Sequence, residues 1–126
     1  MANEIVLSIG SNSADKSIQM QNCIEWLQSR LQEVRVSSVY ATPALNGKDA
    51  DYLNAVIIAK SEIEFDECKQ IMKQYEASCG RTIESKLKGS IPIDIDIVIW
   101  NNDIKKNNDI NQTYFQKGWC ELTEKQ

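Results

Sequence analysis

The chain has 126 residues, of which 42% are hydrophobic and 25% are charged, and its formal net charge is −4. These proportions are typical of a globular protein, and the length predicts a single domain over residues 1–126. The negative charge argues against a non-specific nucleic-acid-binding protein, and no apolar run approaches the length of a membrane span. We therefore expect a cytoplasmic protein that binds neither nucleic acid nor membranes.

The sequence contains no histidine, which narrows the chemistry available to the chain. Histidine-based zinc sites, Ser-His-Asp triads and a histidine general base are all excluded. Any catalysis must therefore depend on carboxylates, cations, metal ions or the positioning of reactants. The four cysteines contain no Cys-x-x-Cys pair, which favours free thiols over a disulfide framework.

The first half of the chain predicts a strand, a helix and a second strand. Apolar residues alternate over 4–9, which indicates a strand, and turn residues follow it at 10–13. Asp15 is a candidate cap for a helix that runs to about residue 32, with apolar residues at helical spacing. Alternation over 34–40 predicts the second strand.

The next elements are a loop, a strand and a second helix. Pro43 and an Asn-Gly pair mark residues 42–51 as a loop, and alternation over 53–59 predicts a third strand. Residues 64–79 have helical spacing and are followed by Gly80, a typical helix terminator. We expect a second polar loop over 81–90.

The most informative segment is a strand that carries two aspartates. Isoleucine occupies every odd position from 91 to 99, and Asp94 and Asp96 stand between these isoleucines. Strict alternation places the two aspartates on one face of a strand, about 6–7 Å apart at their backbones. Carboxylates this close repel each other unless a cation lies between them, and hard oxygen ligands suit Mg²⁺. The alternative is an ordinary solvated strand face with two surface acids.

The order strand, helix, strand, strand, helix, strand is typical of the ferredoxin-like βαββαβ fold. This α+β fold has an antiparallel sheet with two helices on one face. We expect all five isoleucines to pack beneath the helices, and a site to lie on the exposed sheet face between loops 42–51 and 81–90. Residues 101–109 are too polar to add to the core and predict a hairpin or a mobile loop.

Five short strings, taken together, resemble one enzyme family. They are Ile9-Gly10-Ser11-Asn12, Val39-Tyr40-Ala41-Thr42-Pro43, Asp51-Tyr52-Leu53-Asn54-Ala55-Val56, Glu76 with Gly80-Arg81, and Ile93-Asp94-Ile95-Asp96. In this order and spacing the chain resembles the 6-hydroxymethyl-7,8-dihydropterin pyrophosphokinases of folate biosynthesis over about residues 4–100. The resemblance implies Mg²⁺-dependent transfer of diphosphate from ATP to the pterin, with release of AMP.

The resemblance also implies roles for individual residues. Asp94 and Asp96 would hold two Mg²⁺ ions, and with Arg81 they would form the catalytic group. The pterin would be bound by Thr42, Pro43, Leu45, Tyr52, Asn54 and Trp119. The nucleotide would be bound by Glu76, Arg81, Lys86, Lys88 and Lys117. Structural alternatives stay open for three of them: Asn54 could tie down a turn, Trp119 could be a core anchor, and Glu76 could be a surface charge at the end of a helix.

The phosphate-binding part departs from the family pattern. Ile91 stands where the family has an arginine, and Lys88 stands where it has a tryptophan. The Pro-His string expected after the last strand is Gln112-Thr113-Tyr114 here. Lysines supply point charges without the bidentate geometry of arginine, so activity is expected to be weak if it persists. The alternatives are a non-catalytic pterin-binding relative and an unrelated interaction domain of the same fold.

Overall fold

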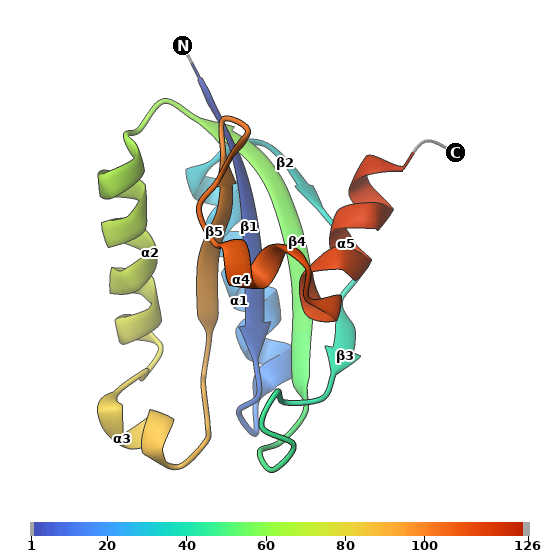
Figure 1. Ribbon diagram of the computed structural model, residues 1–126. Helices are drawn as coiled ribbons and strands as arrows, with labels where there is room; N and C mark the ends of the chain where they lie inside the picture. The colour runs from blue at the N-terminus through green and yellow to red at the C-terminus, as the bar shows by residue number, and fades with distance from the viewer. Residues whose placement is uncertain (1, 125–126) are drawn as a thin grey trace.

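The computed structural model describes residues 2–124, and at its centre is a six-stranded antiparallel sheet (Figure 1). The strands are β1 (Asn3–Ser11), β2 (Gln32–Val36), β3 (Tyr40–Thr42), β4 (Tyr52–Ser61), β5 (Asp94–Trp100) and β6 (Asp103–Ile104). Their order is β2-β4-β1-β5-β6, and β3 also pairs with β4. This arrangement confirms the predicted ferredoxin-like α+β fold.

Helices α1 (Lys16–Arg30) and α2 (Phe65–Ser78) cover one face of the sheet. Each helix buries residues at helical spacing, among them Met20 and Leu27 in α1 and Met72 in α2. They pack on the apolar side chains that alternate along β1, β4 and β5. Gly80, at φ +95°, follows the end of α2 in the left-handed conformation that glycine adopts without strain. No helix of the described chain is long and apolar enough to cross a membrane.

The sequence suggested that the second face of the sheet would be exposed, but helices cover part of it. Helices α4 (Asn107–Ile110) and α5 (Thr113–Thr123) lie over it, on the side opposite to α1 (Figure 1). Phe115 of α5 is fully buried there against Val56 and Val98. Gly118 allows a close approach, because a Cβ at that position would come within 2.7 Å of Val56. The sheet therefore has a small second core beneath the C-terminal helix.

The expected strand over 34–40 is divided into β2 and β3. Between them, Ser37 uses its backbone N–H to bond the Val56 carbonyl at 3.0 Å and its side-chain Oγ to accept from the Val56 N–H at 2.9 Å. A side chain thus takes the place of a backbone partner, and the strand bends. The loop after α2 also contains a short helix, α3 (Ile83–Leu87), which begins at Thr82 with a capping box.

The last strand departs from strict alternation at one point. Ile93, Ile95 and Ile97 lie in the core beneath α1 and α2, as predicted. Ile99 instead packs with the second cluster, so that part of the prediction is wrong. The register moves from Val6↔Ile99 to Leu7↔Ile97, and this bulge leaves an extra residue that reverses the direction of the following side chains. Beyond it, Asn101 and Asn102 at positive φ form the predicted hairpin turn to β6.

Candidate functional site

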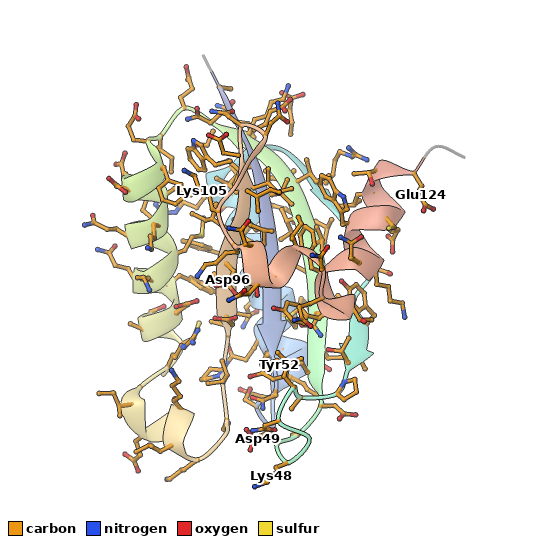
Figure 2. All side chains as sticks on the ribbon, viewed as in Figure 1. Lys48, Asp49, Tyr52, Asp96, Lys105 and Glu124 are labelled. Atoms are coloured by element: carbon orange, nitrogen blue, oxygen red, sulfur yellow. The ribbon has the colours of Figure 1, made fainter. Side chains whose placement is uncertain are left out.

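A cavity of about 310 Å³ lies at one end of the sheet, where β1 ends and β4 begins. Five of the six residues predicted to bind a pterin line it: Thr42, Pro43, Leu45, Tyr52 and Asn54. Residues 8–10 of β1, Asp94 of β5 and Tyr114 of α5 also line it. Figure 2 shows Tyr52 near Asp49 at this end of the sheet and Asp96 farther along β5. The structure therefore gathers residues from four separate segments around one polar-rimmed hollow, which we call the first cavity.

Asn54 is held in a fixed orientation at the floor of the first cavity. It is 5% exposed, and its Nδ2 donates to the hydroxyl of Thr42 at 2.5 Å. The glycine at position 10 is required beside it, because a Cβ there would lie 2.9 Å from the Asn54 Oδ1. An amide offers both a donor and an acceptor, so a fixed Asn54 can recognise a heterocycle edge that carries both.

Tyr114 is placed in the wall by an unusual contact between α5 and the sheet. The hydroxyl of Tyr40 donates to the Tyr114 carbonyl at 2.5 Å and accepts from the Gly118 N–H at 3.0 Å. These two groups are four residues apart, the spacing of an ordinary helical bond. The Tyr40 hydroxyl therefore lies between two backbone groups of α5 that a regular helix would bond to each other. A side chain inserted in this way can bend a helix locally.

A second cavity of about 500 Å³ lies between α2 and β5. The predicted residues Glu76, Arg81, Asp94 and Asp96 line it. Four lysines outside the predicted set also line it: Lys69, Lys73, Lys105 and Lys106. Asp94 borders both cavities, so the two meet at one carboxylate.

Arg81 joins the end of α2 to the aspartate strand. Its Nη1 lies 2.6 Å from the Asp94 Oδ1 and 3.2 Å from the Glu76 Oε2, and it donates to the Ile93 carbonyl at 3.3 Å. Glu76 in turn accepts the Ile95 N–H at 2.7 Å. Burial raises the pKa of Glu76, while the bond from Ile95 and the charge of Arg81 oppose that rise.

Asp94 and Asp96 face β1 at positions with small side chains. Asp94 pairs with Gly10 and Asp96 with Ser8, which leaves room above the strand. Burial, together with the neighbouring Asp94, raises the pKa of Asp96 to about 8. The ammonium of Lys106, 3.7 Å from Asp96, only partly offsets this. Two carboxylates in this position require additional positive charge to ionise together near neutral pH.

The two aspartates fit a magnesium site in which the protein supplies few ligands. In residues 2–124 no group of three or more histidine, cysteine, aspartate or glutamate side chains is arranged to hold a metal ion. Mg²⁺ commonly takes one or two carboxylates and fills its other positions with water and phosphate oxygens. The crowded pair and the open volume beside it match that mode of binding and do not match an all-protein cage.

Four of the predicted site residues lie away from the linings of both cavities. Lys86 and Lys88 belong to the α3 region, and Lys88 pairs with Glu84 at 3.1 Å. The ammonium of Lys117 lies over the Tyr40 ring, 5.3 Å from its centroid. Trp119 stacks on Phe115 in the second core, with ring centroids 5.7 Å apart. Their ligand-binding roles stay predictions.

Two of the four lysines of the second cavity could have been predicted from the spacing of residues in α2. Lys69 and Lys73 are four residues apart, and Glu76 follows three residues later, so all three share one face of the helix. Lys105 and Lys106 follow the hairpin that ends in β6, and this hairpin brings them close to Asp96. No pattern in the sequence predicts that approach.

The fold and the two cavities define the structural class of this protein. It is a ferredoxin-like α+β protein with cavities beside one strand that carries two aspartates. A sequence profile of the family described as 7,8-dihydro-6-hydroxymethylpterin-pyrophosphokinase (HPPK) matches residues 6–124. The chain therefore belongs to the HPPK family.

Three relatives named 2-amino-4-hydroxy-6-hydroxymethyldihydropteridine pyrophosphokinase are similar to the chain. The one from Porphyromonas gingivalis is 32% identical over 101 residues, which cover 75% of this chain and 67% of the relative. The one from Aquifex aeolicus is 30% identical over 101 residues, which cover 79% and 62%. The one from Bacillus subtilis is 27% identical over 106 residues, which cover 82% and 63%. The chain thus matches about two thirds of the length of these relatives.

Proposed function

We propose that this chain transfers a diphosphate group from ATP to 6-hydroxymethyl-7,8-dihydropterin. The observation that carries the proposal is that the two cavities meet at Asp94. One cavity holds the residues matched to pterin recognition, and the other holds Asp96 and a set of cations. A hydroxymethyl group and a triphosphate bound in these cavities would come together at the shared carboxylate.

The first cavity suits a small flat heterocycle. Its volume of about 310 Å³ is at the lower end of the range for small-molecule sites. Tyr52 offers a ring to stack on, and Asn54 offers a donor and an acceptor to the edge of the pterin. Backbone groups of the segment from Thr42 to Leu45 are available beside them. The reading of Asn54 as only a turn residue has less support, because its amide is fixed at the cavity floor.

The second cavity suits a phosphate chain. Lys69, Lys73, Lys105 and Lys106 surround the space beside Arg81, and they offer the positive charge that the missing arginines would supply. Mg²⁺ bound at Asp94 and Asp96 would neutralise phosphate charge and orient the phosphates. A guanidinium has five N–H donors, so the contacts of the Arg81 Nη1 leave its other nitrogens available for phosphate oxygens.

The proposed reaction requires positioning more than acid–base chemistry. The pterin hydroxymethyl oxygen forms a bond to the β-phosphorus, the bond to the α–β bridging oxygen breaks, and AMP leaves. The hydroxyl proton passes to solvent. Holding the two substrates in contact at Asp94 supplies the proximity on which such a transfer depends. A chain without histidine can meet these requirements.

A second candidate function is pterin binding without catalysis. It is favoured by Ile91, where the family has an arginine, and by Lys86 and Lys88, which lie outside both cavities. This alternative keeps the first cavity in use and leaves the second without turnover.

Formation of AMP separates these functions. The purified full chain is incubated with ATP, Mg²⁺ and 6-hydroxymethyl-7,8-dihydropterin, and AMP is quantified with and without the pterin. We expect AMP that depends on the pterin and disappears when EDTA is added. Pterin binding without AMP would establish the second candidate. A chain that binds no pterin would contradict both.

We propose that Tyr114, and not Trp119, closes the first cavity opposite Tyr52. Tyr114 lines that cavity, whereas the Trp119 ring is stacked on Phe115. We expect Tyr114→Ala to weaken pterin binding about fivefold, since an aromatic contact stabilises by roughly 1 kcal/mol. Titration calorimetry with 6-hydroxymethyl-7,8-dihydropterin measures the effect. Trp119→Phe keeps the apolar packing and serves as the matched variant; if it weakens binding more than Tyr114→Ala does, the stacking role belongs to Trp119.

A further inference from the structure

Asn12 lies where the two loops that border the cavities approach each other. It directly follows β1 and is 4% exposed. We call residues 43–51, between β3 and β4, the first site loop. We call residues 79–93, between α2 and β5, the second site loop. The first loop contributes Pro43 and Leu45 to the first cavity, and the second carries Arg81.

The Asn12 side chain bonds both loops at once. Its Nδ2 donates to the Gly89 carbonyl at 2.8 Å and to the Ala50 carbonyl at 3.3 Å. Its Oδ1 accepts the Ile91 N–H at 2.6 Å, and its backbone N–H donates to the Ile91 carbonyl at 3.1 Å. One residue therefore connects the end of β1 to the first loop through one bond and to the second loop through three.

An asparagine is needed for this set of bonds. The carboxamide has one acceptor oxygen and two N–H donors, and here the one side chain donates two bonds and accepts one. Aspartate would keep the acceptor but would face two carbonyl oxygens without a donor. Alanine would leave the buried Ile91 N–H and the two partly buried carbonyls of Ala50 and Gly89 without this partner, and buried polar groups are costly to leave unpaired.

The two loops also touch directly. The carboxylate of Asp49 packs on Gly89, where an added Cβ would lie 2.2 Å from the Asp49 Oδ1. Gly89 has φ +72°, a conformation that disfavours other residues. The Asn46 Nδ2 holds the Asp49 carboxylate from within the first loop at 2.8 Å. The contact between the loops therefore depends on a glycine in one and on an oriented carboxylate in the other.

We propose that Asn12 is a positioning residue that couples the two site loops, so that order in one loop is transmitted to the other. Through this coupling, the wall of the first cavity and the loop that carries Arg81 keep a fixed relation to each other. The inference goes beyond the proposed function, and its test requires no ligand. It also differs from a local turn role, which would need only the bonds between Asn12 and Ile91.

Hydrogen exchange measured by mass spectrometry on the ligand-free full chain tests the coupling. We compare the wild type with Asn12→Asp and Asn12→Ala. Both variants are expected to exchange about tenfold faster in peptides of the first loop and in peptides of the second loop. Each variant loses the bond that Asn12 donates to Ala50 of the first loop and the bond that it donates to Gly89 of the second. Peptides of β4 are expected to exchange as in the wild type.

Two matched variants serve as controls within single loops. Asn46 bonds only its own loop, through Asp49 and the N–H groups of Lys48 and Asp49. The Ser85 side chain bonds only Thr82, in the capping box. Asn46→Ala is expected to speed exchange mainly in the first loop, and Ser85→Ala only in the second. If Asn12→Asp exchanges like the wild type in either loop, Asn12 has a local role and the proposal is wrong.

A third variant tests the coupling without changing Asn12, in case its variants unfold. Gly89→Ala disturbs the second loop by its φ and pushes on Asp49 of the first. We expect faster exchange in the first loop as well as in the second. An effect restricted to the second loop, or faster exchange throughout β1 and β4, would overturn the proposal.

Discussion

Asp96→Ala is expected to lower the rate of pterin-dependent AMP formation by about a thousandfold or more. The substitution removes one of the two carboxylates proposed to hold Mg²⁺, and a bound ion of this kind supplies several kcal/mol of charge stabilisation in the transition state. Binding of the pterin alone is expected to persist, because Asp96 does not line the first cavity. Steady-state rates of AMP formation and pterin calorimetry in the absence of nucleotide measure the two effects.

A companion variant separates lost chemistry from lost folding. Asp96→Asn keeps the shape and removes a carboxyl group whose ionised form is disfavoured by burial and by Asp94. Without divalent cations and near neutral pH, the free energy of unfolding of this variant is expected to be at least that of the wild type, with a gain of up to about 1 kcal/mol. Asp103→Ala, on the exposed hairpin strand β6, is the control for loss of an acidic residue. Wild-type turnover by Asp96→Ala would remove this residue from the proposed mechanism.

Replacement of Arg81 is expected to affect both activity and stability. Arg81→Ala leaves Glu76, 9% exposed, and Asp94 without their common cation. We expect a loss of about 2 kcal/mol in the free energy of unfolding, the scale for hydrogen bonds to charged groups, because Arg81 itself is partly exposed. Urea denaturation measures this loss. The rate of AMP formation is expected to fall at least about a hundredfold.

Arg81→Lys distinguishes charge from geometry. Lysine keeps the charge but has a single nitrogen, which cannot bridge Asp94 and Glu76 while also reaching a phosphate. We expect most of the stability to return while the rate stays low. Arg30→Lys, on the outer face of α1, is the control. Full recovery of the rate in Arg81→Lys would show that a point charge is sufficient at this position.

The parts of the fold that could be predicted are those fixed by local periodicity. Alternation along β1 and β5 and helical spacing in α1 and α2 reflect which side chains face the core, so the ferredoxin-like order followed directly. The bulge that turns Ile99 to the second core depends on how β5 pairs with β1. The covering of the second face depends on Gly118 meeting Val56, far away in sequence. Neither contact has a local signal.

The candidate site shows the same division. Thr42, Tyr52 and Asn54 were found because they stand in recognisable strings beside strand ends, and they do lie together. Lys105 and Lys106 were missed because a hairpin folds them back over Asp96. The interloop bonds of Asn12 were missed as well, since they join residues 38 and 77 positions apart. Prediction from sequence failed where a side chain acts through distant backbone.

The hydroxyl of Tyr40 inserted into α5 has a consequence for the order of folding. In α5, the Tyr40 hydroxyl donates to the Tyr114 carbonyl and accepts from the Gly118 N–H. In the folded molecule β3, which carries that hydroxyl, is paired with β4 of the central sheet. We therefore expect the C-terminal helix to complete its backbone bonds only once the sheet has assembled. The wall that Tyr114 gives to the first cavity is then expected to be among the last parts of the molecule to form.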